Sequence, residues 1–416
     1  MILNDSFKIK VLTFGTFYFT LVCGLQWSYI NVIPLAVTWI FQLLFLYIAF
    51  NINSSKNLIN SDRKLLKVYL AWCFFNIIRG ALFYTLGNYW IWKSLIVGSF
   101  DVLLPSLVYV YSNPQIIGKI LRYWYKYALF LFVILFPFLS KGAYHFYLGP
   151  IYIVGCFWSI YTRKWRCIIL FLLLLMMVAD YGARSQVIKT GVVFLISIGY
   201  IYRRFITYSM LKAIHWVCYI LPIILLALGL SGVFNIFEDL SSSNEGKYVE
   251  QKIDKDGNVV DDDLSSDTRT FIFVEIINSA INNNYVIWGR TPARGNDSQH
   301  FGLFNAEVLK TGLYERHANE TGLPSLFTWL GLVGLVLLSL IYLRSSYLAV
   351  YKSNNLFIKY LGCFVAFRWA YGWIEDMYSF QPMILALWMM IGMCISEKFR
   401  NMNDAEMKLW LIKLVK

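Results

Sequence analysis

Arginines and one histidine gather in a polar part of the chain that lies between two apolar regions. The run Gly289-Arg290-Thr291-Pro292-Ala293-Arg294-Gly295 is followed by Glu315-Arg316-His317-Ala318-Asn319-Glu320. Guanidinium groups bind phosphate oxygens as a bidentate fork, and a neutral imidazole can accept a proton from a hydroxyl group. Residues of these types favour chemistry on an anionic, phosphate-bearing substrate.

Two more arginines stand at the starts or ends of apolar segments. Arg184 follows an apolar run within Asp180-Tyr181-Gly182-Ala183-Arg184-Ser185-Gln186. Ser266-Asp267-Thr268 can cap a helix that begins near Arg269. Apolar residues follow at helical spacing, namely Phe271, Val274, Ile277, Ala280 and Ile281. We expect this helix to lie on the outer membrane surface with that face down, its N-terminus forming an anion site with Arg269.

Each of these candidates has a simpler interpretation. Arg184 can anchor lipid headgroups or pair with Asp180, and His317 can be an ordinary loop histidine. His300, with Asp297 nearby, is a weaker candidate of the same kind.

Charged residues inside apolar runs are functional candidates by default. Arg368 precedes Glu375 and Asp376 and is a candidate for lining a site. Arg79 and Asp101 lie at similar predicted depths, which predicts a structural salt bridge.

The elements that position these residues are mostly apolar helices. The chain has 416 residues, of which 58% are apolar and 15% charged. Runs of about 20 apolar residues predict about twelve membrane spans. Their centres lie near Phe19, Leu43, Phe75, Leu103, Val133, Ile153, Leu173, Leu195, Ile223, Leu337, Phe364 and Trp388. The predicted fold is therefore an all-α polytopic membrane protein.

One large extracytoplasmic loop separates the ninth predicted span from the tenth. The expected organisation is residues 1–235 for spans one to nine, 236–323 for the loop, 324–397 for the last three spans and 398–416 for a cytoplasmic tail. Lysine and arginine concentrate in alternate connections, which places both termini in the cytoplasm. The net charge of +13 thus reflects topology and does not indicate nucleic-acid binding.

The first part of the loop, residues 241–267, is acidic. Lys255-Asp256-Gly257-Asn258 can close a small hairpin. Asp254, Asp256 and the run Asp261-Asp262-Asp263 invite a calcium interpretation, but the EF-hand spacing fails after Asp256. A solvated acidic flap is the preferred interpretation. All seven cysteines lie in or beside predicted spans, without a disulfide framework or zinc spacing.

Arginines and a histidine at the outer bilayer surface suit a lipid-linked diphosphate as substrate. Guanidinium groups would stabilise the charge that builds on a leaving diphosphate, while the histidine activates an acceptor hydroxyl. This chemistry needs neither a divalent metal nor a nucleotide sugar, so no cofactor is expected. The predicted catalytic residues are His317, Arg184 and Arg269, and the predicted substrate-binding residues are Arg290, Arg294, Arg316, Asn319, Glu320 and Arg368.

In its predicted topology and in three short stretches, the chain resembles the bacterial O-antigen polymerases and O-antigen ligases, which are membrane glycosyltransferases of the GT-C type. Tyr181-Gly182-Ala183-Arg184-Ser185 is similar to the family's small-Arg-small turn. Thr268-Arg269-Thr270-Phe271-Ile272-Phe273 through Trp288-Gly289-Arg290 is similar to its Arg-led helix. His317-Ala318-Asn319-Glu320, with Leu330-Gly331-Leu332-Val333-Gly334, is similar to its histidine motif and Gly-rich span.

The resemblance implies phosphate-binding roles for Arg184 and Arg269 and the base role for His317. It implies a bacterial inner-membrane enzyme that acts on undecaprenyl diphosphate-linked oligosaccharide at the periplasmic face, with a chain-length regulator as a further partner. Ala318 interrupts the ligase-type His-Asn pair, which favours a polymerase over a ligase. A flippase for the same lipid-linked sugars and a structural scaffold are the alternatives from other classes.

Overall fold

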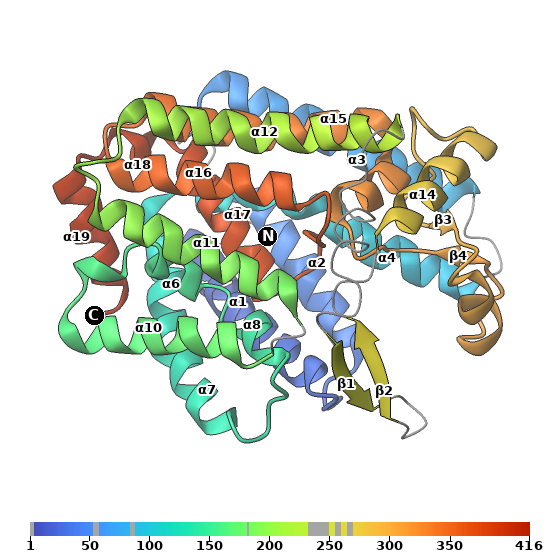
Figure 1. Cartoon of the computed structure of the whole chain (residues 1–416), viewed down its shortest axis with the longest axis horizontal. Helices are drawn as coiled ribbons and strands as arrows, with labels where there is room; N and C mark the ends of the chain where they lie inside the picture. Colours follow the sequence, from blue (N-terminus) through green and yellow to red (C-terminus); the bar gives the residue numbers. More distant parts are fainter. Residues whose placement is uncertain are drawn as a thin grey trace.

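The protein is predominantly helical, with only two short two-stranded sheets among the described residues. The computed structural model describes residues 4–52, 58–83, 88–180, 183–231, 249–253, 259–263 and 269–416. Long helices run side by side along the longest axis of the molecule (Figure 1).

The first half of the chain, to residue 201, contains α1 (Asp5–Trp27), α2 (Leu35–Asn51), α3 (Asn60–Phe83), α4 (Tyr89–Leu103), α5 (Val108–Tyr111), α6 (Pro114–Tyr123), α7 (Leu129–Leu135), α8 (Ala143–Tyr147), α9 (Ile151–Gly155), α10 (Arg163–Val178) and α11 (Arg184–Ile201). The second half contains α12 (Tyr208–Leu230), β1 (Val249–Ile253), β2 (Val259–Asp263), α14 (Thr270–Asn282), β3 (Asn296–Asp297), β4 (Glu315–Arg316), α15 (Gly322–Lys352), α16 (Leu356–Tyr371), α17 (Pro382–Ile395), α18 (Glu397–Asn401) and α19 (Asp404–Leu414). Short 3-10 or π turns lie at Leu104–Leu107, Trp124–Ala128, Trp158–Ile160 and Phe304–Val308.

Within the part of the chain that the structure describes, five helical segments are long and apolar enough to cross a membrane. They are Asp5–Trp27, Asn60–Phe83, Tyr89–Tyr111, Tyr208–Gly229 and Gly322–Lys352. Large apolar side chains face outward on other helices too, as Ile40, Phe171 and Leu195 show. Exposed apolar surface of this extent suits contact with lipid. The count of about twelve spans stays a prediction.

The predicted span centred on Ile153 is wrong as a single helix. The segment forms α8 and α9, each five residues long, on either side of Leu148-Gly149-Pro150. Proline cannot continue a helix through its own position, and Gly149 lies so close to α17 that an added Cβ would meet the Met383 Cα atom at 2.3 Å. Irregular backbone of this kind is tolerated within membrane proteins where protein covers it. Residues 147–157 are accordingly buried.

The polar connections lie at opposite ends of the bundle. In Figure 1, α14, β3 and β4 gather at one end, while α18 and α19 lie at the other. At the α18 end, the Asp62 carboxylate accepts a hydrogen bond from Arg344 Nε at 2.7 Å, which ties the start of α3 to α15. Because Asp62 is buried, this pair fixes the position of α15 relative to α3.

A sharp kink interrupts α15 at Gly331. The residue has φ 67° and ψ −171°, a backbone conformation that is essentially restricted to glycine. A kink in a helix frees backbone groups that would otherwise bond one turn away. Those groups need other partners because this part of α15 is buried.

The loop after α14 supplies most of these partners. Arg290 N donates to Thr328 O at 2.6 Å, and Thr291 N donates to Trp329 O at 3.0 Å. In the opposite direction, Leu332 N donates to Val286 O at 2.8 Å. The indole of Trp72 on α3 donates to the remaining carbonyl, Leu330 O, at 2.9 Å. The kink therefore provides the backbone hydrogen-bonding groups on which residues 286–291 dock.

The structure confirms the helix predicted after the acidic segment. Arg269 is the N-cap of α14, and the expected capping residues 266–268 lie outside the described residues. The face buried against the protein contains Ile272, Glu275, Ile276, Ser279 and Ala280. Of the residues predicted to face the membrane, Val274 and Ile281 are exposed and Ala280 is buried. Contact of this face with the outer membrane surface stays a prediction.

Two further predictions can be compared with the structure. The antiparallel pairing of β1 with β2 confirms a hairpin, although its turn residues 254–258 lie outside the described residues. The Arg79–Asp101 salt bridge is wrong: Arg79 donates to the carbonyl oxygens of Trp288 and Gly289, and Asp101 is within electrostatic range of Asp376. Arg79 thus serves the docking of the loop.

Replacing Gly331 with alanine should release the loop from α15. The backbone conformation alone disfavours alanine by on the order of 1–3 kcal/mol, and the new Cβ would lie 2.2 Å from Ile287 O. We expect a clear loss of thermal stability of the detergent-solubilised protein and faster proteolysis between residues 283 and 321. Gly191→Ala is the matched control, because no atom lies within 4 Å of an added Cβ there. Equal stability of the two variants would contradict the docking role of the kink.

Candidate functional site

Three of the predicted site arginines converge at the end of the bundle where the loop docks. Arg184 is the first residue of α11, Arg269 is the N-cap of α14, and Arg368 lies in the last turn of α16. All three act electrostatically on the hydroxyl group of Tyr371, which ends α16. Residues far apart in the sequence thus surround one tyrosine hydroxyl, together with Glu375, and the three guanidinium groups are here called the arginine cluster.

Arg368 is the buried member of the arginine cluster. Its side chain is 3% exposed, and its Nε and Nη1 atoms have no hydrogen-bond partner among the described residues. A buried unpaired polar group is costly and marks a candidate site. Beside it, the fully buried Lys189 of α11 forms an ion pair with Glu375.

The connection between α16 and α17 contains two acidic residues of this region, Glu375 and Asp376. Gly322 N donates to Glu375 O at 2.9 Å, and Leu323 N donates to Gly372 O at 2.8 Å, so the connection packs on the start of α15. Burial raises the pKa of Asp376 to about 7, with Glu375 acting in the same direction and backbone hydrogen bonds from Tyr378 and Met377 opposing it. A carboxyl group with such a pKa is a further indication of a functional region.

Glu320 links the arginine cluster to the loop. Its two carboxylate oxygens lie 2.5 Å from Arg269 Nη1 and 3.4 Å from Arg316 Nη2. The Arg316 guanidinium also lies over the ring of Phe301 at 4.3 Å. The Glu320 side chain is 62% exposed. An exposed carboxylate between two guanidinium groups marks this as a position that favours an anion.

His317 is held as a neutral imidazole with one free acceptor nitrogen. Its Nε2–H donates to Pro292 O at 2.9 Å, its ring packs on Trp329, and Trp329 Nε1 donates to the His317 carbonyl at 2.9 Å. Burial lowers its pKa below the usual value of 6.5; the Pro292 hydrogen bond and Glu315 oppose this shift, and Lys93 adds to it. Because a carbonyl can only accept, Nδ1 is the nitrogen that remains available as a base.

A cavity of about 410 Å³ opens beside His317, between α4 and the loop. Its walls include Trp90 and Lys93 from α4 and the aromatic rings of Phe301 and Phe304. Aromatic faces combined with a few polar groups are typical of ligand sites. The cavity also reaches Arg316, whose partner Glu320 contacts Arg269. Ion pairs through Glu320 thus link one residue of the cavity wall to Arg269 of the arginine cluster.

Arg290 and Arg294 hold the loop together in this structure. Arg294 binds both carboxylate oxygens of Glu315 through Nε, at 3.0 and 2.9 Å. Arg290 lies 3.0 Å from the same carboxylate and 2.7 Å from Asp297. The guanidinium forks of both residues are thus already filled by carboxylates. Their predicted role in substrate binding stays a prediction, and their observed contacts are structural.

Asn319 and His300 also make loop contacts. Asn319 Nδ2 donates to Asn296 Oδ1 at 2.8 Å, and its backbone N–H donates to Ser325 Oγ at 3.0 Å. The ring of His300 pairs with Glu275 of α14 at 3.0 Å and not with Asp297 as the sequence suggested. The Pro292 carbonyl, rather than Asn319 or Glu320, orients the ring of His317.

Four residues of this region were not assigned a role from the sequence: Lys189, Glu375, Glu315 and Glu275. A signal existed for Lys189, because a lysine within an apolar helix requires a buried partner. No local sequence pattern indicates that Glu275 binds residues 298–300 or that Glu315 binds two arginines.

Glu315→Gln should loosen the loop. The glutamine amide cannot neutralise Arg290 and Arg294, and breaking a buried ion pair costs on the order of 3 kcal/mol. We expect a lower unfolding temperature and faster cleavage by added protease within residues 283–321. Glu307→Gln is the matched control, because Glu307 is exposed and accepts a hydrogen bond from Tyr314 only. If the Glu315→Gln protein resists protease as well as this control does, Glu315 does not hold Arg290 and Arg294 in place.

Comparisons with known proteins were made by family model, by sequence and by structure. No family model, no curated protein and no solved structure matches the chain. The arginine cluster and His317 with its cavity are therefore the features from which a function can be inferred.

Proposed function

We propose that the protein is a membrane glycosyltransferase that uses an oligosaccharide linked to undecaprenyl diphosphate as its donor. The observation that carries the proposal is the convergence of Arg184, Arg269 and Arg368 at the end of the helical bundle, next to a neutral histidine and a cavity. A lipid-linked donor suits this location, because its polyprenyl chain stays in the bilayer while its diphosphate reaches the bundle end.

The arginine cluster would bind the diphosphate of the donor. Arg184 and Arg269 lie at helix N-termini, where backbone N–H groups also favour anions. Arg368 adds a buried guanidinium group with unpaired N–H donors. As the bond from the anomeric carbon to the diphosphate oxygen breaks, these groups stabilise the charge on the leaving group.

His317 would activate the acceptor sugar within the cavity beside it. Its Nδ1 takes the proton of the acceptor hydroxyl, and the hydroxyl oxygen forms a bond with the anomeric carbon of the donor. The electron pair of the broken bond leaves with the diphosphate, so charge and atoms balance without a metal ion. Base catalysis contributes about 10²–10⁴-fold, and the arginine cluster supplies further stabilisation of the transition state.

Two versions of this reaction differ only in the acceptor. A polymerase joins one lipid-linked repeat unit to another, as we propose here, whereas a ligase transfers the glycan to a sugar of the lipid A core. A second candidate function is a flippase for the same lipid-linked sugars. The buried Lys189–Glu375 pair beside Arg368 favours it, because transporters use charged pairs within helices.

A surface-polysaccharide gel from a strain lacking this gene separates these functions. Re-expressed wild-type protein should restore a ladder of long chains, and His317→Ala should leave a single repeat unit on the core. Complete loss of capped core with accumulated lipid-linked polymer would instead indicate a ligase. A ladder from His317→Ala as long as the wild-type ladder would contradict the base role. Membrane abundance of the variant is the control for folding.

Arg184→Lys should impair transfer nearly as strongly as Arg184→Ala. A guanidinium group binds two phosphate oxygens at once, which an ammonium group cannot do. Removing one such donor costs on the order of 10²–10³ in rate, measured as product formed from lipid-linked donor by purified protein. Arg204 is an exposed arginine after α11, so Arg204→Lys is the control and should leave the rate of transfer unchanged. Wild-type rates in Arg184→Lys would mean that a point charge suffices.

The pH dependence of transfer should report the protonation of His317. Because its pKa is lowered, His317 stays neutral, and activity should persist, at pH values below 6.5 before falling at lower pH. Lys93→Gln removes a cation that contributes to this lowering, so the acidic limb should move to higher pH. Asp376 lies in the connection between α16 and α17, and the charged side chains that shift its pKa are Glu375 and Lys189. Lys141→Gln, an exposed lysine, is the control, and an unmoved limb in Lys93→Gln would exclude His317 as the titrating base.

A further inference from the structure

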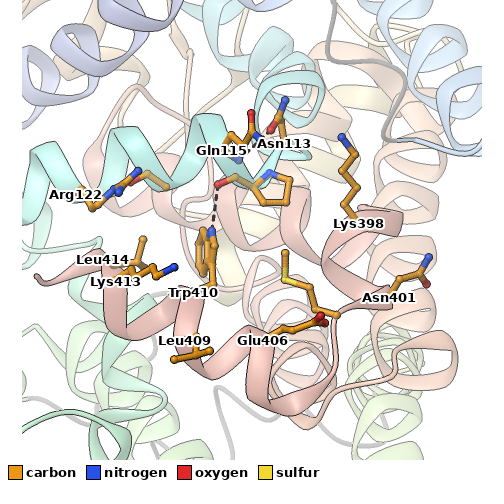
Figure 2. A pocket seen from close by; sticks show the side chains of 13 residues that line it. Asn113, Gln115, Arg122, Lys398, Asn401, Glu406, Leu409, Trp410, Lys413 and Leu414 are labelled. Atoms are coloured by element: carbon orange, nitrogen blue, oxygen red, sulfur yellow. Dashed lines mark hydrogen bonds between the residues drawn. The ribbon is translucent and has the colours of Figure 1, made fainter.

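A second cavity lies at the opposite end of the bundle from the arginine cluster. It has a volume of about 890 Å³ and is enclosed by α6, α18 and α19 (Figure 2). Trp410 of α19 stands in its middle and donates from Nε1 to Pro114 O of α6 at 3.1 Å. This hydrogen bond, together with the buried Met407, Leu411 and Leu414, fixes the C-terminal helix in place.

Three cations line this cavity without a neutralising partner. Arg122, Lys398 and Lys413 have no carboxylate within 4.0 Å among the described residues. Arg122 Nε donates only to Gly118 O, at 3.0 Å. The one acid in the lining, Glu406, accepts the N–H of Asn403 as part of a capping box at the start of α19. The cavity therefore has a net positive charge that the protein itself leaves uncompensated.

The remaining lining is largely apolar. Leu409 is 58% exposed at the cavity, and the half-buried Met402 and Trp410 add further apolar surface. A soluble anion needs the cations alone, whereas a molecule with a charged head and an apolar tail would use both parts of the lining.

The cavity lies at the level where apolar helices end. The candidate span Tyr89–Tyr111 ends just before Pro114, and α17 ends at Ile395 just before α18. Ser396 Oγ donates to Ser112 O at 2.6 Å, so the two helix ends lie at the same height. Cations and a tryptophan at the end of an apolar helix are typical of the membrane interface.

We propose that this cavity is a binding site for an anionic phospholipid. Its phosphate would lie among Arg122, Lys398 and Lys413, and an acyl chain would cover Leu409 and Met402. The site is independent of glycosyl transfer and would stabilise the packing of α19 against α6. Each cation near an anionic lipid contributes about fivefold to affinity, so the three together contribute on the order of 100-fold.

Lipid retention by the purified full-length protein tests this site. The protein is mixed in detergent with equal amounts of phosphatidylglycerol and phosphatidylcholine, and bound lipid is counted by native mass spectrometry. The wild type should retain phosphatidylglycerol preferentially. The triple variant Arg122→Gln, Lys398→Gln, Lys413→Gln should lose this preference. The control triple Lys119→Gln, Lys164→Gln, Lys408→Gln removes the same charge from exposed positions outside the lining and should keep it.

Each other outcome overturns the proposal. Equal retention of the two lipids by the wild type would contradict a preference for anionic lipid. This result does not depend on whether the triple variant folds. Equal losses in the two triple variants would show general attraction to net charge. Displacement of phosphatidylglycerol by an equal concentration of sn-glycerol 3-phosphate would identify a site for soluble phosphate esters. The single variant Lys413→Gln, at an exposed position, should already weaken retention about fivefold.

Discussion

The kink of α15 at Gly331 is the feature on which the loop and the candidate site depend. A straight helix would use the carbonyl groups of Thr328, Trp329 and Leu330 within itself. The kink releases them, and residues 290, 291 and Trp72 bind them instead. Membrane proteins tolerate such a break only where the freed groups find partners. Here the partners belong to the loop, so breaking the helix and docking the loop are one event.

The consequences of this docking reach both parts of the site. Trp329, two residues before Gly331, binds the His317 carbonyl through its indole N–H, and the docked Pro292 carbonyl fixes the His317 ring. The same loop carries Arg316 and Glu320, which connect to Arg269 at the start of α14. The buried ion pair between Lys189 and Glu375 then joins α11 to the connection after α16. A backbone conformation available essentially only to glycine thus positions the loop that carries His317 and Arg316.

Part of this arrangement could be predicted from local sequence signals. The helix beginning near Arg269 and the hairpin around residues 254–258 follow from capping and turn patterns. The kink at Gly331 and the broken segment around Ile153 could not be predicted from hydropathy, because an apolar run has the same composition whether its helix is straight or broken. The partners of Arg79, Glu275 and Glu315 also escaped prediction, since each contact joins residues that only the tertiary fold brings together.

The most direct test of the central claim is a single-turnover assay with purified protein in detergent. The protein is mixed with undecaprenyl diphosphate-linked repeat units in EDTA, and the lipid and glycan products are separated and identified by mass spectrometry. We predict one free undecaprenyl diphosphate for each new glycosidic bond, with both products lost together in Arg368→Ala. Intact donor after prolonged incubation of a folded wild-type protein, or turnover that depends strictly on added Mg²⁺, would contradict the account.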